Sequence, residues 1–138
     1  MNQTLTIEVP STRESIASAS AQAEEWLQSH RPSAQTLNLL LITIEELVIN
    51  CIDYGFDDDQ LHTIRLMLSI EGRNLTITVV DDGHPFDPLA MPLPDLSLPV
   101  QARPVGGLGI YLLRQLADQI TYQRRDEFNE LTISRRLD

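Results

Sequence analysis

Cysteines, histidine clusters and nucleophile signatures are scarce in this sequence of 138 residues. Cys51 is the single cysteine, so no disulfide can form within the chain and no cysteine cluster can hold a metal. The three histidines lie far apart, without the spacing that gathers metal ligands. No Gly-x-Ser-x-Gly motif is present. These absences argue against a disulfide scaffold, a histidine or cysteine metal site and covalent catalysis.

Positive charge and long apolar runs are also scarce. Ten Lys and Arg residues stand against 20 Asp and Glu residues, which gives a net charge of −10. That charge repels polyanions, so we expect no direct nucleic-acid partner, although backbone amides can still hold a small anion such as a nucleotide. No apolar run approaches the roughly 20 residues of a membrane span, and no N-terminal signal pattern is present. We therefore expect a cytoplasmic protein that does not contact a membrane.

The composition indicates one globular domain, 1–138, with an aliphatic core, since 42% of the residues are hydrophobic and 5% aromatic. Period-2 alternation predicts five strands, and helical spacing predicts three helices. Their order, β-α-α-β-β-loop-α-β-β, favours an α+β fold: a two-layer α/β sandwich in which three helices cover one face of a mostly antiparallel mixed sheet. The strands are expected at 5–9, 63–70, 75–80, 120–124 and 130–137.

Helix ends and one long loop are marked by particular residues. Ser11 followed by Glu14 is a capping-box pattern, Ser33 is suited to cap the second helix, and Gly55 is suited to end it. The segment 85–104 holds six of the eight prolines and has little periodicity. A loop of this length inside a compact domain is usually functional or mobile.

The second predicted helix carries polar residues on one side. At about 100° per residue, Glu46, Asn50 and Asp53 fall within roughly 60° of one another, opposite the apolar stripe. A solvated polar face would explain them, because such residues are common on exposed helices. Ile42 and Ile49 share that side, which favours a covered face. In that case Glu46 can act as a general base and the side-chain oxygen of Asn50 can bind Mg²⁺.

The stretch DDGHPFDP, 81–88, ends a predicted strand with two carboxylates and a glycine. A plain turn, with Phe86 closing the edge of the core, is one interpretation. The other is a pocket in which one carboxylate accepts a hydrogen bond from an exocyclic amine such as that of adenine, while Gly83 lets the backbone approach a ring. The residues alone leave both interpretations open.

A glycine cluster, GGLG at 106–109, precedes the third predicted helix. Free backbone N–H groups at the positive end of a helix form an anion site. The alternative is a flexible hinge, because the cluster fits neither the GxxxxGK[ST] nor the GxGxxG pattern.

Three motifs in order resemble the N, G1 and G2 boxes of the GHKL ATPase superfamily: Glu46-x-x-x-Asn50 on a helix, Asp81-x-Gly83 after a strand, and Gly106-Gly107-x-Gly109 before a helix. The residues FDP at 86–88, the proline-rich segment and the final two strands are most similar to bacterial anti-sigma factor serine/threonine kinases. The resemblance covers essentially the whole chain. It implies the Bergerat (histidine kinase-like ATPase) fold, with ATP and Mg²⁺ as cofactors.

The resemblance also implies a role for each matched residue. Glu46 would be the catalytic base, Asn50 the Mg²⁺ ligand and Asp81 the adenine contact. The segment from about 88 to 105 would be an ATP lid, in which Arg103 is a candidate phosphate or substrate contact. The remaining nucleotide-binding positions would be Gly83 and Phe86 near the base, and Gly106, Gly107, Leu108 and Gly109 near the phosphates.

Two features depart from the family pattern. Asp53 and Tyr54 stand where members often carry a basic residue and a histidine, which puts any phosphate contact from that turn in doubt. The last hairpin also lacks the glycine often found before the final strand, so it is expected to turn differently.

The resemblance implies a Mg-ATP-dependent serine/threonine protein kinase that phosphorylates a STAS-domain anti-anti-sigma protein. The same surface is a candidate site for a sigma factor, and a homodimer is a further expectation. The alternative is an ATP- or ADP-binding module that switches partners without phosphorylating them. A detached histidine-kinase ATP domain is less favoured, because no helical hairpin with a phosphoacceptor histidine is present.

Overall fold

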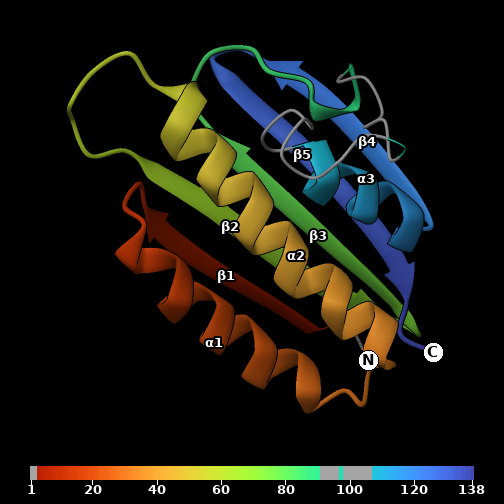
Figure 1. The fold of residues 1–138 in the computed structure, drawn as a ribbon. Coiled ribbons are helices and arrows are strands. Elements are labelled where there is room, and N and C mark those ends of the chain that lie inside the picture. Colours follow the sequence, from red (N-terminus) through yellow and green to blue (C-terminus); the bar gives the residue numbers. More distant parts are fainter. Residues whose placement is uncertain (1–2, 91–96, 98–106) are drawn as a thin grey trace.

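The computed structural model describes residues 3–90, 97 and 107–138, and its elements follow the predicted order (Figure 1). The strands are β1 (Gln3–Pro10), β2 (Thr63–Glu71), β3 (Asn74–Asp81), β4 (Gln119–Arg125) and β5 (Phe128–Arg136). The helices are α1 (Glu14–Gln28), α2 (Ala34–Asn50) and α3 (Gly107–Leu116). A π-helical turn, η1 (Cys51–Gly55), continues α2, and a 3-10 turn, η2 (Pro88–Ala90), follows β3.

The strands form a single five-stranded sheet in the order β1-β2-β3-β5-β4. Its four neighbouring pairs are all antiparallel. The predicted α+β sandwich with three helices on one face is therefore confirmed, although among the described strands the sheet is purely antiparallel rather than mixed (Figure 1). The reason is the connectivity: α3 leads to the edge strand β4, and the hairpin from β4 then inserts β5 antiparallel to β3.

Alternation along the central strands brings two polar residues to the helix-covered face. The buried positions of β3 run from Leu75 to Val79, and the next position of that row is Asp81. In β5 the buried row begins at Asn129. The register pairs Asp81 with Asn129, whereas Asp82 is exposed. Strand periodicity thus separates the two adjacent carboxylates.

The central helix α2 lies between α1 and α3 above the sheet (Figure 1). The helical stretch Ala34–Gly55 has 22 residues and a mean hydropathy of 1.4, so by length and composition alone it could cross a membrane. The expectation that no apolar run approaches this length is therefore wrong. Helices in the core of a folded domain share this composition. The side chains of α2 that are buried in this core are Leu39, Leu40, Ile44, Leu47 and Val48.

One of the two predicted helix caps is confirmed and the other is wrong. Ser33 caps α2, because its hydroxyl oxygen accepts a hydrogen bond from the Thr36 amide at 3.2 Å. At α1, however, the N-cap position is Arg13, with no side-chain cap. Ser11 instead binds the start of β2: its hydroxyl accepts from the His62 amide, and its own amide donates to the His62 carbonyl. These bonds hold Ser11 to the sheet, two residues before the cap position of the helix.

The two hairpin turns use different residues for left-handed backbone. Gly72 has φ of 62° in the β2–β3 turn, at the hairpin predicted there. In the β4–β5 turn, Asp126 takes the same conformation with φ of 55°. Asp is among the few non-glycine residues that tolerate this region. Asp126 therefore replaces the glycine that the last hairpin lacks.

The cap at Ser33 gives the first prediction. Ser33→Ala should lower the free energy of unfolding by about 1 kcal/mol, because the Thr36 amide loses its acceptor at the start of the core helix. Urea denaturation measures this change. The matched control is Ser18→Ala, since Ser18 is exposed within α1 and alanine favours helix there. Equal stabilities for the two variants would contradict the capping role.

Candidate functional site

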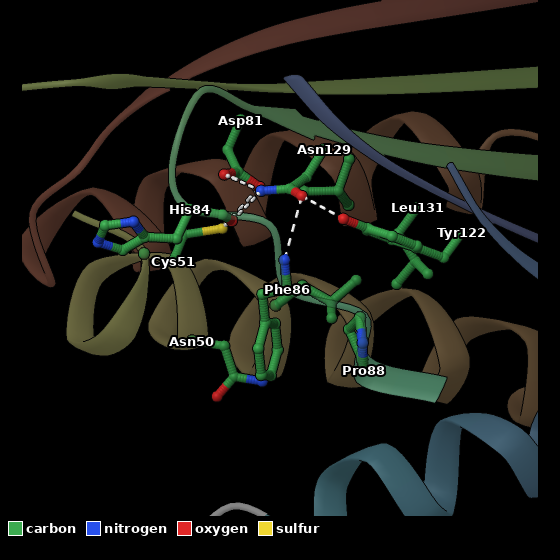
Figure 2. A pocket seen from close by; sticks show the side chains of 12 residues that line it. Asn50, Cys51, Asp81, His84, Phe86, Pro88, Tyr122, Asn129 and Leu131 are labelled. Carbon is green, nitrogen blue, oxygen red and sulfur yellow. Dashed lines mark hydrogen bonds between the residues drawn. The ribbon is translucent and has the colours of Figure 1, made fainter. Parts of the chain in front are cut away.

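A pocket opens between the C-terminal end of α2 and the adjoining ends of β3, β5 and β4 (Figure 2). Its apolar walls include Leu47, Val79 and Leu131. The polar groups that line it are Asn50, Cys51, Asp81, His84, Tyr122 and Asn129. A mostly apolar cleft with a few convergent polar groups is the usual form of a small-molecule site.

The carboxylate of Asp81 lies inside this pocket with 8% exposure. Its Oδ1 atom accepts hydrogen bonds from the Gly83 amide at 2.9 Å and from Asn129 Nδ2 at 3.0 Å. Among the described residues, its Oδ2 atom accepts only from a weak thiol donor, Cys51 Sγ, at 3.3 Å. Burial, followed by the neighbouring carboxylate, raises the pKa of the Cys51 thiol, so Cys51 is a neutral donor. Asp81 is thus an oriented acceptor, and this placement favours the pocket interpretation over a plain turn.

Asn50 is also buried, with 8% exposure, and it lines the pocket. Its Nδ2 atom is inaccessible to solvent and has no hydrogen-bond partner among the described residues. An unpaired buried amide N–H costs free energy, so a group of this kind calls for a specific explanation, of which a bound ligand is one. The solvated-face interpretation is therefore wrong for Asn50. Within the described residues no cluster of three or more His, Cys, Asp or Glu side chains could hold a metal. The side-chain oxygen of Asn50 still fits Mg²⁺, because this ion is commonly held by one or two protein oxygens together with phosphates and water.

Glu46 lies one helical turn before Asn50 and meets the first turn of α3. A Cβ atom on Gly109 would stand 1.9 Å from Glu46 Cδ, so only glycine allows this approach. Burial raises the pKa of the Glu46 carboxyl, and the nearby Glu45 charge raises it further. A carboxylate made more basic in this way is suited to accept a proton. The third residue of the predicted polar face, Asp53, is instead paired with Arg13 at 2.5 Å, and Tyr54 is 58% exposed.

Gly83 allows the chain to turn tightly after β3. A Cβ atom there would lie 2.4 Å from the Gly55 carbonyl oxygen and 3.0 Å from Asp81 Oδ1. The next amide, of His84, donates to that same Gly55 carbonyl at 2.8 Å. Two residues further on, Phe86 lines the pocket and its amide donates to Asn129 Oδ1 at 3.3 Å (Figure 2). The DDGHPFDP stretch is therefore fastened on one side to η1 and on the other to β5.

The glycine cluster is described only from α3 onward. Gly107 begins that helix, Leu108 is 45% exposed, and Gly109 contacts Glu46. The start of α3 is thus next to the Glu46 carboxylate. Arg103, Gly106 and most of the predicted lid, 88–105, lie outside the described residues, apart from Pro88–Ala90 and Ser97. Their roles stay predictions.

A cluster of acidic and histidine side chains, which we call the rim cluster, lies beside Gly83; its members are Asp57, Asp58, His62, Asp82 and His84. The His62 ring is hydrogen-bonded to Asp58 at 2.7 Å and to Asp82 at 3.2 Å. It also stacks on Phe56, with ring centroids 4.0 Å apart. On the same rim, His84 pairs with Asp57 at 2.7 Å. These contacts link the η1–β2 connection to the turn after β3.

Several pocket residues were not predicted from the sequence. Asn129 bridges Asp81 and the turn after β3, and Tyr122 donates its hydroxyl to Asn129 Oδ1 at 2.5 Å. Cys51 was expected only as a small buried residue, and it also donates to Asp81. The alternation that ends in Ile133 could have placed Asn129 on the buried face, because it continues two residues at a time back to 129. No sequence signal indicates that Asn129 and Asp81 are partners.

The three-helix, five-stranded fold and a pocket at the end of its central helix are accompanied by a family match that defines the class of the domain. The histidine kinase-like ATPase domain family matches residues 9–135, and the chain belongs to this family. Because this is a family of kinase-like ATPase domains, we assign ATP as the cofactor of the chain.

Individual relatives agree with this assignment. The chain is 28% identical over 122 residues to the serine/threonine-protein kinase BtrW of Bordetella bronchiseptica, and the match spans 86% of each chain. Part of the crystal structure of the RsbU and RsbW domains of Rv1364c from Mycobacterium tuberculosis shares its fold, with a TM-score of 0.70 at 18% identity. That match covers 98% of this chain but 32% of the mycobacterial one. The histidine kinase AdeS of Acinetobacter baumannii matches with a TM-score of 0.52 at 11% identity, over 97% of this chain and 68% of the other.

The two close glycine contacts predict different effects of a methyl group. Gly83→Ala should lower the free energy of unfolding by about 1–3 kcal/mol, because its Cβ meets the Gly55 backbone, which cannot move freely. Gly109→Ala should change stability much less, because its Cβ meets the Glu46 side chain, which can rotate away. Thermal denaturation of both variants makes the comparison. A larger loss for Gly109→Ala would contradict this difference.

The rim cluster predicts a pH-dependent contribution to stability. Hydrogen bonding to Asp58 raises the pKa of His62 above 6.5, and the same bond lowers the pKa of Asp58 below 3.8. The His62 contribution is fully present below pH 6.5 and is lost as pH rises through the folded-state pKa. The Asp58 contribution is present above pH 3.8 and is lost as pH falls through its folded-state pKa.

His62→Gln should therefore destabilise the protein most between these two ordinary pKa values, near pH 5–6, and least above about pH 8. Urea denaturation of the variant and the wild type at a series of pH values measures the difference. A difference that is constant from pH 5 to pH 8 would show that the charge on His62 contributes nothing.

Proposed function

We propose that this ATPase domain is a Mg-ATP-dependent serine/threonine protein kinase of the anti-sigma factor type. The observation that carries the proposal is the position of Glu46, which lies one turn from Asn50, beside the start of α3, with a raised pKa. The similarity to a serine/threonine-protein kinase over 86% of the chain supports it. The fold similarity to an RsbW domain is consistent with it.

Each element of the site has a part in the proposed transfer. When bound, ATP would supply the phosphoryl group, and Mg²⁺ would offset the negative charge on it. Asp81 accepts a hydrogen bond from the exocyclic amine of adenine, and Asn50 provides a metal ligand. The amides at the start of α3, Gly107 and Gly109, bind phosphate oxygens. Glu46 orients the hydroxyl of the substrate and takes its proton as the hydroxyl oxygen bonds to the γ-phosphorus; the bond to the β–γ bridging oxygen breaks, and ADP would leave. Most of the catalysis is therefore positioning.

The proposed substrate is a serine or threonine of a STAS-domain anti-anti-sigma protein, and a sigma factor is a second candidate partner. This partner-switching role rests on the resemblance of the three motifs and on the RsbW-type fold. A homodimer, a cytoplasmic location and the absence of direct nucleic-acid or membrane contacts belong to the same proposal. The net charge of −10 supports the exclusion of nucleic acid.

A nucleotide-binding switch without phosphotransfer is the second candidate. The contact between Glu46 and Gly109 favours it, because α3 covers part of the carboxylate that a substrate hydroxyl has to reach. A kinase requires this contact to open, whereas a switch module can retain it.

Glu46→Gln distinguishes these functions. Removal of a general base should reduce phosphate transfer from labelled ATP to a STAS-domain protein of the same genome by about 100-fold or more. The affinity for ATP should stay within about threefold, since the base contacts the substrate hydroxyl rather than the nucleotide. Transfer is measured by autoradiography and affinity by calorimetry.

A glutamate on another helix provides the matched control. Glu25 is exposed on α1, so Glu25→Gln should keep both transfer and affinity close to wild type. Normal transfer by Glu46→Gln would exclude Glu46 as the base. Tight ATP binding by the wild type with no transfer to any STAS-domain protein of that genome would favour the switch module.

A further inference from the structure

The carboxamide of Asn129 lines the pocket, is fully hydrogen-bonded and belongs to a residue that is 6% exposed (Figure 2). Its Nδ2 atom donates to Asp81 Oδ1 at 3.0 Å and to the His84 carbonyl at 2.7 Å. Its Oδ1 atom accepts from the Phe86 amide at 3.3 Å and from the Tyr122 hydroxyl at 2.5 Å. These bonds use both donors and both lone pairs of the amide.

This set of partners fixes the orientation of the amide. The Asp81 carboxylate and the His84 carbonyl can only accept, so the NH₂ group must face them. The Phe86 amide can only donate, so the oxygen must face that side. No other side chain of this size offers two donors and an acceptor in one plane, so the network requires asparagine at 129.

The bonds of Asn129 leave the two oxygens of Asp81 unequal. Oδ1 already accepts from Asn129 and from the Gly83 amide. Oδ2 accepts from the Cys51 thiol, which is a weak donor. Both Cys51 and Asp81 line the pocket. A stronger N–H donor that enters the pocket therefore finds its acceptor at Oδ2.

We propose that Asn129 is a positioning residue of the nucleotide site: it holds the Asp81 carboxylate with Oδ2 available to the amine of adenine, and thereby sets the preference for adenine. The inference rests on the proposed role of Asp81 in binding ATP. The same amide holds the His84 carbonyl and the Phe86 amide, so one side chain fixes both the acceptor and a wall of the pocket.

The test compares the affinities for ATP and for ITP, which carries a carbonyl where adenine carries the amine. A hydrogen bond to a charged acceptor discriminates by about tenfold or more, so the wild type should prefer ATP by at least that factor. Asn129→Ala frees the carboxylate to rotate and should reduce the ATP-to-ITP preference to within about threefold of unity. Calorimetry measures both affinities, and thermal denaturation verifies that the variant is folded.

Asn129→Asp adds a pH readout that a purely structural role would not give. Two carboxylates about 3 Å apart resist ionising together, so the pair keeps one shared proton to a higher pH than a lone carboxyl does. The protonated form restores a donor to Asp81, so the preference for ATP should return at pH 5 and disappear by pH 8. The other titratable groups at this end of the pocket are Tyr122 and Cys51, while the His84 ring pairs with Asp57 and Arg124 donates to the Gly83 carbonyl. The matched control is Asn74→Asp, an exposed position at the far end of β3, which should show no such pH dependence.

A milder variant covers the case in which the Asn129 variants do not fold. Tyr122→Phe removes a single hydroxyl that donates to Asn129, so it should lower the ATP-to-ITP preference by a few-fold in a folded protein. A wild-type preference in every folded variant, with only the melting temperature lowered, would overturn the positioning role. A wild type that binds neither nucleotide would instead refute the proposed ATP function itself.

Discussion

A buried carboxylate needs donors, and this requirement organises the end of the sheet. Asp81 is the last residue of the buried row of β3, where an unpaired charge would be costly. Its partners come from three separate parts of the chain: Cys51 after α2, Gly83 in the following turn and Asn129 at the start of β5. The order β3-β5 in the sheet brings the last of these to it. The strand order of the sheet therefore determines which donors reach the buried carboxylate of Asp81.

Two glycines allow the close packing of the helices and turns around this end of the sheet. Without a Cβ at Gly83, the turn after β3 lies against the carbonyl of Gly55, and without one at Gly109, α3 lies against Glu46. Both contacts converge on the C-terminal half of α2 and the π-helical turn that follows it. Because that turn continues the helix beyond Asn50, it also brings Cys51 to Asp81 and Asp53 to Arg13. The central helix and the turn that follows it thus bring together Glu46, Asn50 and the buried Asp81 carboxylate.

The local patterns of the sequence predicted the helices, the strands and the three motifs. The features that they did not predict are contacts between residues far apart in the chain. Strand alternation and helical spacing act over a few residues, so the strands and the placement of Glu46 and Asn50 on one helix followed directly. The partnership of Asn129 with Asp81 depends on the register between strands 48 residues apart. The failed cap at Ser11 has the same origin, because the bond of Ser11 to His62 spans 51 residues and outweighs a local capping pattern. Local rules fail here where tertiary hydrogen bonds compete with them.

The charge of the chain limits how it can bind a nucleotide. Its ten basic residues are all arginines, and none of the nine that the structure describes lines the pocket; the tenth, Arg103, lies outside the described residues. Those near the site have other partners: Arg13 pairs with Asp53, and Arg124 donates to the Gly83 carbonyl. In the proposed function, a triphosphate bound to a domain of net charge −10 is therefore neutralised mainly by its metal ion and by backbone amides at the start of α3. This arrangement makes binding depend on Mg²⁺ and on the exact position of α3, which Gly109 and Glu46 set. The contact that places the catalytic base is then also the contact that places the phosphate amides.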